Sequence, residues 1–232
     1  MRLFAVATSA MVLLAISTPV PSQPTADIPR FVRCSGPLVF YLPGDYYFCR
    51  GADRQMAGQP TAALDYFERA AAWGHKKAQY LLGLMHFQGD GTQVDRPLGL
   101  AWLTLAAERD DRDMDAALAF ARRHVSSAEH AQAEQLLATM RLTYADAVTV
   151  ERAAIRYERE TRPIRRSFDP FSTMYIAGFG FGTSGSLLRK LDHRAEVFFE
   201  GARGGDVAVG GLEVVSDGED KPEEDPSGNG ER

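Results

Sequence analysis

The sequence predicts an all-α protein whose middle part is a short α-α solenoid. Two observations lead to this prediction. Apolar residues recur with the period of an amphipathic helix over residues 46–142, and a helical unit within that stretch is repeated after 36 residues. The chain of 232 residues, 45% hydrophobic and 25% charged, has enough apolar residues for one core with appended segments.

The repeated unit consists of two helical segments separated by a short break. Residues 63–71 (ALDYFERAA) align with residues 99–107 (GLAWLTLAA), and residues 78–83 (AQYLLG) align with residues 114–119 (MDAALA). Small residues in these segments let neighbouring helices approach closely. A single helical pair cannot bury its apolar face, so the pairs are expected to stack.

Each predicted helix carries one apolar stripe. The stripes of the first two helices consist of Leu64, Phe67, Ala70 and Ala71, and of Ala78, Leu81, Leu82 and Met85. We therefore expect Leu81 and Leu103 in the core and Gln79 on the exposed side.

Turn and capping residues mark the ends of the helices. In the connector of residues 89–95 (GDGTQVD), the glycines permit left-handed turns and Asp95 can cap the next helix, with Pro97 tolerated in its first turn. Farther on, Ser126 and Glu129 have the form of a capping box. We expect the helix that starts there to complete the last pair and to cap the solenoid.

These residues resemble a known repeat. The resemblance rests on the run of residues 78–83 and on the positions that follow it: Phe87, Gly89, Gly91, Asp95, Trp102, Ala106 and Ala107. Together they are similar to the Sel1-like repeat, a relative of the tetratricopeptide repeats. Thr92 stands where that pattern has Val, and Leu98 and Gly99 stand where it has Lys and Ala.

The resemblance implies an adaptor or scaffold, often in bacterial envelopes, that holds a protein partner in a concave groove. From the residues themselves, which show no catalytic arrangement and no metal-ligand spacing, we expect no enzyme, no cofactor and no metal. Possible partner-binding residues are the aromatic side chains of the repeats, of which only exposed ones would count: Tyr66, Tyr80, Phe87 and Trp102. The alternative is an envelope hydrolase or cell-wall-binding protein that uses the C-terminal region.

The first residues have the form of a secretory signal. Arg2 precedes an apolar run over residues 3–16 that is shorter than the roughly 20 residues of a membrane-spanning helix, and Ser17, Pro19 and Pro21 follow it. We expect residues 1–22 to be removed on export to the periplasm of a bacterium, leaving no integral membrane segment; an uncleaved anchor is the alternative. Residues 23–45 contain four prolines and are expected to be extended.

The two cysteines, Cys34 and Cys49, are expected to form one disulfide in an oxidising compartment. Two buried free thiols are the alternative. The five histidines lack metal-ligand spacing with one another or with the cysteines.

Charge is concentrated at one end of the chain. Residues 216–232 carry seven acidic residues against Lys221 and Arg232, so the rest of the chain is close to neutral. A neutral body gives no electrostatic case for a nucleic-acid-binding protein. The composition of this tail predicts disorder and a role in solubility.

Two segments lie between the repeats and the tail. Residues 143–166 are expected to form a charged helix with Val148, Ala154 and Ile155 facing inward. Its basic end is either a site for an anionic partner or membrane headgroups, or a solvated helix end; it comprises Arg159, Arg162, Arg165 and Arg166. Residues 167–215 are Gly-rich, and alternation around residues 195–209 suggests a β-hairpin.

Overall fold

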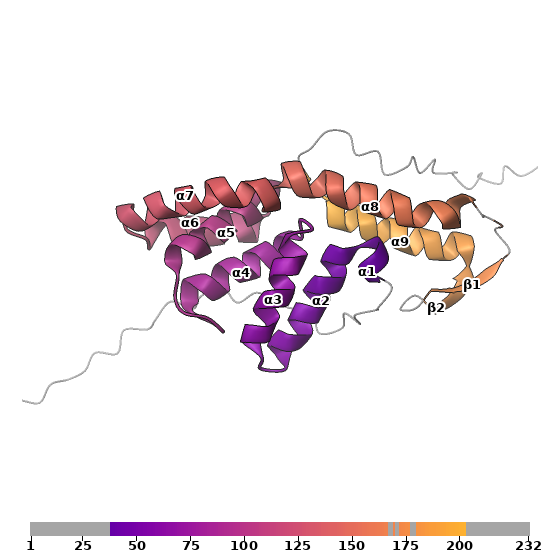
Figure 1. Ribbon diagram of the computed structural model, residues 1–232, viewed down its shortest axis with the longest axis horizontal. Helices are drawn as coiled ribbons and strands as arrows, with labels where there is room; N and C mark the ends of the chain where they lie inside the picture. Colours follow the sequence, from indigo (N-terminus) through magenta and orange to yellow (C-terminus); the bar gives the residue numbers. More distant parts are fainter. Residues whose placement is uncertain (1–37, 167–168, 170–171, 177–179, 203–232) are drawn as a thin grey trace, which may run out of the picture.

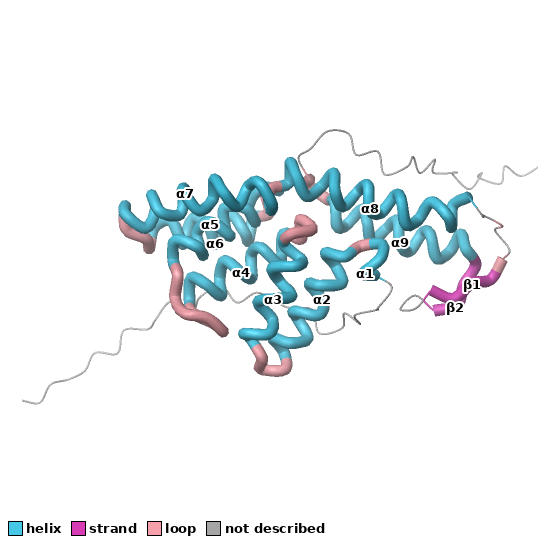
Figure 2. The backbone as a smooth tube through the Cα atoms, viewed as in Figure 1, coloured by secondary structure: helices cyan, strands magenta, loops and turns pink. Residues whose placement is uncertain are grey.

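The computed structural model describes residues 38–166, 169, 172–176 and 180–202. In this part of the chain helices predominate, and the sheet is one two-stranded hairpin (Figures 1 and 2). The elements are α1 (Leu38–Tyr41), α2 (Pro43–Met56), α3 (Pro60–Ala71), α4 (Lys76–Gln88), α5 (Arg96–Ala106), the 3-10 helix η1 (Ala107–Arg109), α6 (Arg112–Arg123), α7 (Ser127–Tyr144), α8 (Asp146–Arg166), β1 (Thr173–Ile176), β2 (Gly180–Thr183) and α9 (Ser184–Phe199).

The predicted helical pairs are confirmed. Helices α2 to α7 pack around one core, in which Leu81 and Leu103 are buried as expected. Helices α4 and α5 approach so closely that a Cβ atom on Gly99 would lie 2.8 Å from the backbone nitrogen of Phe87. This contact explains why Gly99 replaces the usual Ala of the repeat.

The predicted helix ends are confirmed as well. The backbone N–H of Leu98 donates to the side-chain Oδ1 of Asp95 at 3.0 Å, and Gly89 and Gly91 adopt the left-handed φ angles of 81° and 73°. Ser126 and Glu129 form the reciprocal capping box at the start of α7.

One expectation near the start of the repeats is wrong. Residues 38–45 are not extended, because α1 begins at Leu38 and Pro43 starts α2, where its missing N–H would have had no intrahelical acceptor. The remainder of the expected extended segment, residues 23–37, lies outside the described residues, as do the expected signal, Cys34 and the acidic tail.

Helix α8 faces the other way from the prediction. Val148 and Ile155 are exposed, whereas Val150, Ala153 and Tyr157 are buried. The reason is a second core that the repeats do not form, in which α1, α8 and α9 meet. Figure 1 shows α8 continuing the line of α7, with α9 beside it.

The C-terminal region contains a hairpin, but at other residues than expected. Strands β1 and β2 pair antiparallel, with Tyr175 opposite Phe181. Ala195, Val197 and Phe199 lie instead in α9, because Leu187, Leu191 and Ala195 recur at helical spacing and bury one face of that helix. The second expected strand, at residues 207–209, lies outside the described residues.

None of the helices in the described part of the chain is both long enough and apolar enough to cross a membrane.

Candidate partner-binding cleft

A cleft of about 920 Å³ lies between the helical repeats and α9. One wall comes from α2, the start of α4 and the junction of η1 with α6, and the other wall comes from the second half of α9. Its lining residues are Asp45, Phe48, His75, Lys76, Lys77, Arg109, Asp110, Asp111, Met114, Lys190, His193, Arg194, Val197, Phe198, Glu200 and Gly201.

His75 occupies the floor of the cleft. It is the N-cap of α4, and its Nδ1 accepts a hydrogen bond from the backbone N–H of Ala78 at 3.3 Å. Its ring stacks on Phe48 with centroids 4.1 Å apart. Because Nδ1 is an acceptor, we assign the proton of the neutral ring to Nε2, which lies 3.5 Å from Asp45.

Asp45 connects this floor to α9. The Nε of Arg194 donates to its carboxylate at 2.6 Å. Burial, the largest influence, would raise the pKa of Asp45, but the hydrogen bond with His75 and the pair with Arg194 lower it below its ordinary value. Asp45 is therefore ionised at neutral pH and holds α9 against the repeats.

A buried ion network forms the back of the cleft. The Nζ of Lys76 lies within 3.0 Å of oxygens of Gln79, Leu105, Glu108 and Asp146. Four acceptors around one ammonium group satisfy its donors without water. The expectation that Gln79 is exposed is thus wrong: it is fully buried, and it donates to the backbone carbonyl of Tyr144 at 2.8 Å.

Arg109 completes this network. It forms a two-pronged pair with Asp146, the first residue of α8, at 2.8 and 3.0 Å. It also donates to the carbonyls of Gly74 at 3.2 Å and Phe198 at 2.6 Å. Since Lys76 and Arg109 balance Glu108 and Asp146, the network is neutral and joins the repeats to both α8 and α9.

The end of α9 is seated directly on the repeats. A Cβ atom on Gly44 would lie 2.7 Å from the ring of Phe198, so any larger residue at the start of α2 would displace this ring. The position of the second wall of the cleft is thereby fixed.

A profile of the Sel1 repeat matches residues 43–75 and 76–111. The first match spans α2 and α3 and the second spans α4 and α5, so each unit begins one helix earlier than the 36-residue unit inferred from the sequence. Residues 43–111 of this chain are two Sel1 repeats.

No curated protein matches the chain. Among solved structures it is similar to c5321, a protective antigen present in uropathogenic Escherichia coli strains displaying an SLR fold. The two are 18% identical, the TM-score is 0.40, and the match covers 56% of this chain. It covers 27% of the antigen, so this chain corresponds to only a part of that protein's length.

The four aromatic residues named from the sequence do not gather at the cleft. Trp102 and Tyr80 are 3% and 8% exposed, and Trp102 packs edge-on against Tyr144 in the core of the Sel1 repeats. A partner cannot reach the Trp102 ring in this structure, so Trp102 is not one of the partner-binding residues. Tyr66 and Phe87 are half-buried, each beneath an arginine, and line other surfaces.

The free surface of the cleft is polar at its rim and apolar in its wall. Lys77, Lys190 and His193 are exposed, and Val197, 59% exposed, presents an apolar side chain between the two walls. Among the described residues no group of three or more histidines, cysteines and carboxylates could hold a metal ion. The cleft can therefore contribute hydrogen bonds, charge and apolar contacts to binding.

Proposed function

We propose that this chain is an exported scaffold of the bacterial cell envelope that captures a protein partner in the cleft between its Sel1 repeats and α9. The observation that supports this proposal is the cleft itself. Its back and floor are locked by Asp45, Lys76 and Arg109, whereas its exposed side chains have no such role. A preorganised surface with an apolar residue among charged ones suits a peptide segment.

The proposal of export is supported by the apolar run of residues 3–16 and by the two cysteines, which suit an oxidising compartment. An envelope protein is also the setting that the Sel1 resemblance favours. The periplasm is therefore the compartment in which the partner should be sought.

The alternative of an envelope hydrolase finds less support in the C-terminal region. Ser184 is buried at the start of α9, and its hydroxyl donates to the carbonyl of Asp169 at 2.8 Å. This serine fastens the hairpin to the preceding loop and is not presented to a substrate.

Capture from a native envelope extract tests the proposal. Val197→Asp and Lys190→Glu change exposed side chains of the cleft and leave the ion network intact, so the chain should fold and lose its partner. Leu142→Asp and Arg123→Glu make equivalent changes on exposed positions of α7 and α6 away from the cleft. A partner that is retained equally by all four folded variants does not bind in the cleft.

A further inference from the structure

A second hollow, of about 370 Å³, lies between Trp73 and α8. We call it the arginine recess; its lining residues are Trp73, Val148, Glu151, Arg152, Ile155, Arg156 and Arg159. It shares no lining residue with the cleft.

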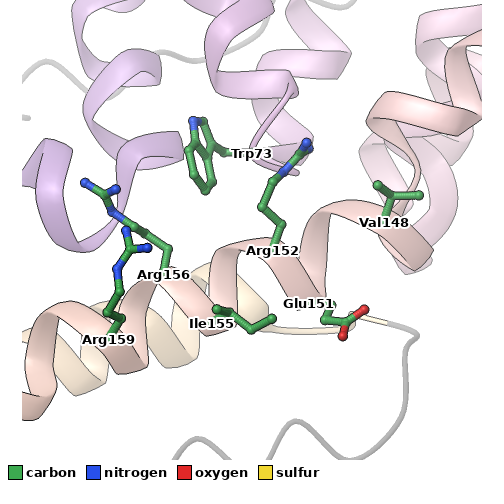
Figure 3. A pocket seen from close by; sticks show the side chains of 7 residues that line it. All are labelled: Trp73, Val148, Glu151, Arg152, Ile155, Arg156 and Arg159. Carbon is green, nitrogen blue, oxygen red and sulfur yellow. The ribbon is translucent and has the colours of Figure 1, made fainter.

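Three cations converge on this recess. Arg152, Arg156 and Arg159 follow at helical spacing along α8, and Figure 3 shows their guanidinium groups on the side of Trp73, whereas the carboxylate of Glu151 points away. Glu160 is shared, at 3.6 Å from Arg156 and 3.1 Å from Arg159. Glu160 supplies one negative charge beside three arginines, so a further anion would reduce the repulsion that remains among them.

The three arginines differ in how firmly they are held. Arg152 lies over the Trp73 ring and donates to the carbonyls of Ala72 and Thr143, while its buried Nε makes no hydrogen bond within the described residues. Arg156 is fixed through its Nε, which donates to Phe40 at 2.8 Å. For the terminal nitrogens of Arg156 and Arg159, no hydrogen bond lies within the described part of the chain, so they are available to carboxylates.

The chain contains a segment of matching chemistry. Residues 217–225 (DGEDKPEED) hold six acidic residues and one lysine, while the rest of the chain up to residue 215 is nearly neutral. The description of the structure ends at Ala202, close to the recess: Gly201 lies against Arg109, and Arg109 donates to Gly74, the neighbour of Trp73. The residues between Ala202 and Asp217 can span up to roughly 50 Å.

We propose that residues 217–225 bind in the arginine recess of the same chain. Their carboxylates accept hydrogen bonds from the terminal N–H groups of Arg156 and Arg159, and the segment covers the exposed side chains of Val148 and Ile155. The covalent connection raises the local concentration of the segment to about the millimolar range, so a weak contact is sufficient. The contact is independent of the cleft and of the partner proposed for it.

Binding in trans tests this proposal. The probe is a labelled synthetic peptide of residues 217–225, titrated by fluorescence anisotropy into the chain truncated after Val215. We expect saturable binding that weakens about a hundredfold in the Arg156→Gln/Arg159→Gln variant, because each of the two lost charged hydrogen bonds has an effect of about tenfold. The Arg122→Gln/Arg123→Gln variant removes two exposed arginines of α6 and should bind as tightly as the parent.

A second peptide has its six acidic residues replaced by the corresponding amides. It tests the proposal even if the variant that lacks both recess arginines folds poorly. This peptide should lose binding to the parent chain. Equal binding of both peptides, or no binding of either, overturns the proposal. So does pelleting of the truncated chain with anionic phospholipid vesicles that excess acidic peptide does not reverse, since the recess would then serve a membrane surface.

Discussion

At the scale of single residues, the packing of the helices depends on buried polar side chains and not only on the apolar stripes. Gln79 and Lys76 lie on the helix that the sequence assigns most clearly, yet both are buried, because α5 and α7 bring acceptors to them. The positions of those acceptors depend on segments 29 and 65 residues away in the chain. No local pattern of residues contains that information.

Gln79→Ala should therefore destabilise the fold by about 1–3 kcal/mol, because the ammonium of Lys76 and the carbonyl of Tyr144 lose a partner. Leu103→Ala should cost about 2–5 kcal/mol through the cavity it leaves. Urea unfolding measures both, with Gln135→Ala on the exposed side of α7 as the control. A Gln79→Ala chain as stable as that control would contradict the buried position of Gln79.

Asp45 gives stability a dependence on pH. Its folded-state pKa lies below its ordinary value of 3.8, so the folded chain binds fewer protons than the unfolded chain in acid. The contribution of Asp45 is therefore fully present above pH 3.8 and is lost as the pH falls through the folded-state pKa.

On acidification below pH 3.8, the parent should lose more unfolding free energy than Asp45→Asn, which has no carboxylate to protonate. Unfolding curves at a series of pH values measure the difference. Parallel losses in the two chains would show that the carboxylate contributes nothing through its charge.

At the scale of elements, the helix ends and the contacts within a repeat follow from the sequence, whereas the contacts between distant helices do not. Asp95, Ser126 and the glycines of the connector act within a few residues, so their geometry is encoded locally. The buried face of α8 depends on α1 and α9, which lie outside the repeats, and its apolar residues fit more than one rotation. The alternation of apolar residues over 195–199 predicts a strand, but Leu187 and Leu191 extend the apolar pattern to the spacing of a helix.

Gly99→Ala tests the close approach of α4 and α5. Alanine favours the helix by up to about 1 kcal/mol over glycine. Here its Cβ would lie 2.8 Å from the backbone of Phe87, which cannot move aside as a side chain could. The variant should have a lower melting temperature than the parent, and a raised melting temperature would show that the two helices have room to separate.

At the scale of the whole molecule, the network of Lys76, Arg109 and Asp146 makes the two Sel1 repeats and the C-terminal helices one unit. The sequence could indicate the Sel1 repeats but not the cleft, because its second wall is a helix more than 70 residues downstream in the chain. The aromatic residues of the repeats are conspicuous in the sequence, but helix stacking takes Trp102 into the core.

The proposed export leads to a prediction about the mature chain. The mature chain should begin between about residues 18 and 27, since signal cleavage follows the apolar run closely. Cys34 and Cys49 should then be joined, so the intact mass should rise by two hydrogens on reduction. Two reactive thiols on unreduced periplasmic protein would contradict the disulfide.

Site-specific photo-crosslinking in the native envelope tests the central claim most directly. A photoreactive residue placed at Val197 lies in the cleft, and one placed at Leu142 is similarly exposed on α7, outside it. The account predicts a discrete protein adduct from position 197 that is missing from position 142. The same adduct from both positions, or an adduct from position 142 alone, would contradict capture of a partner in the cleft.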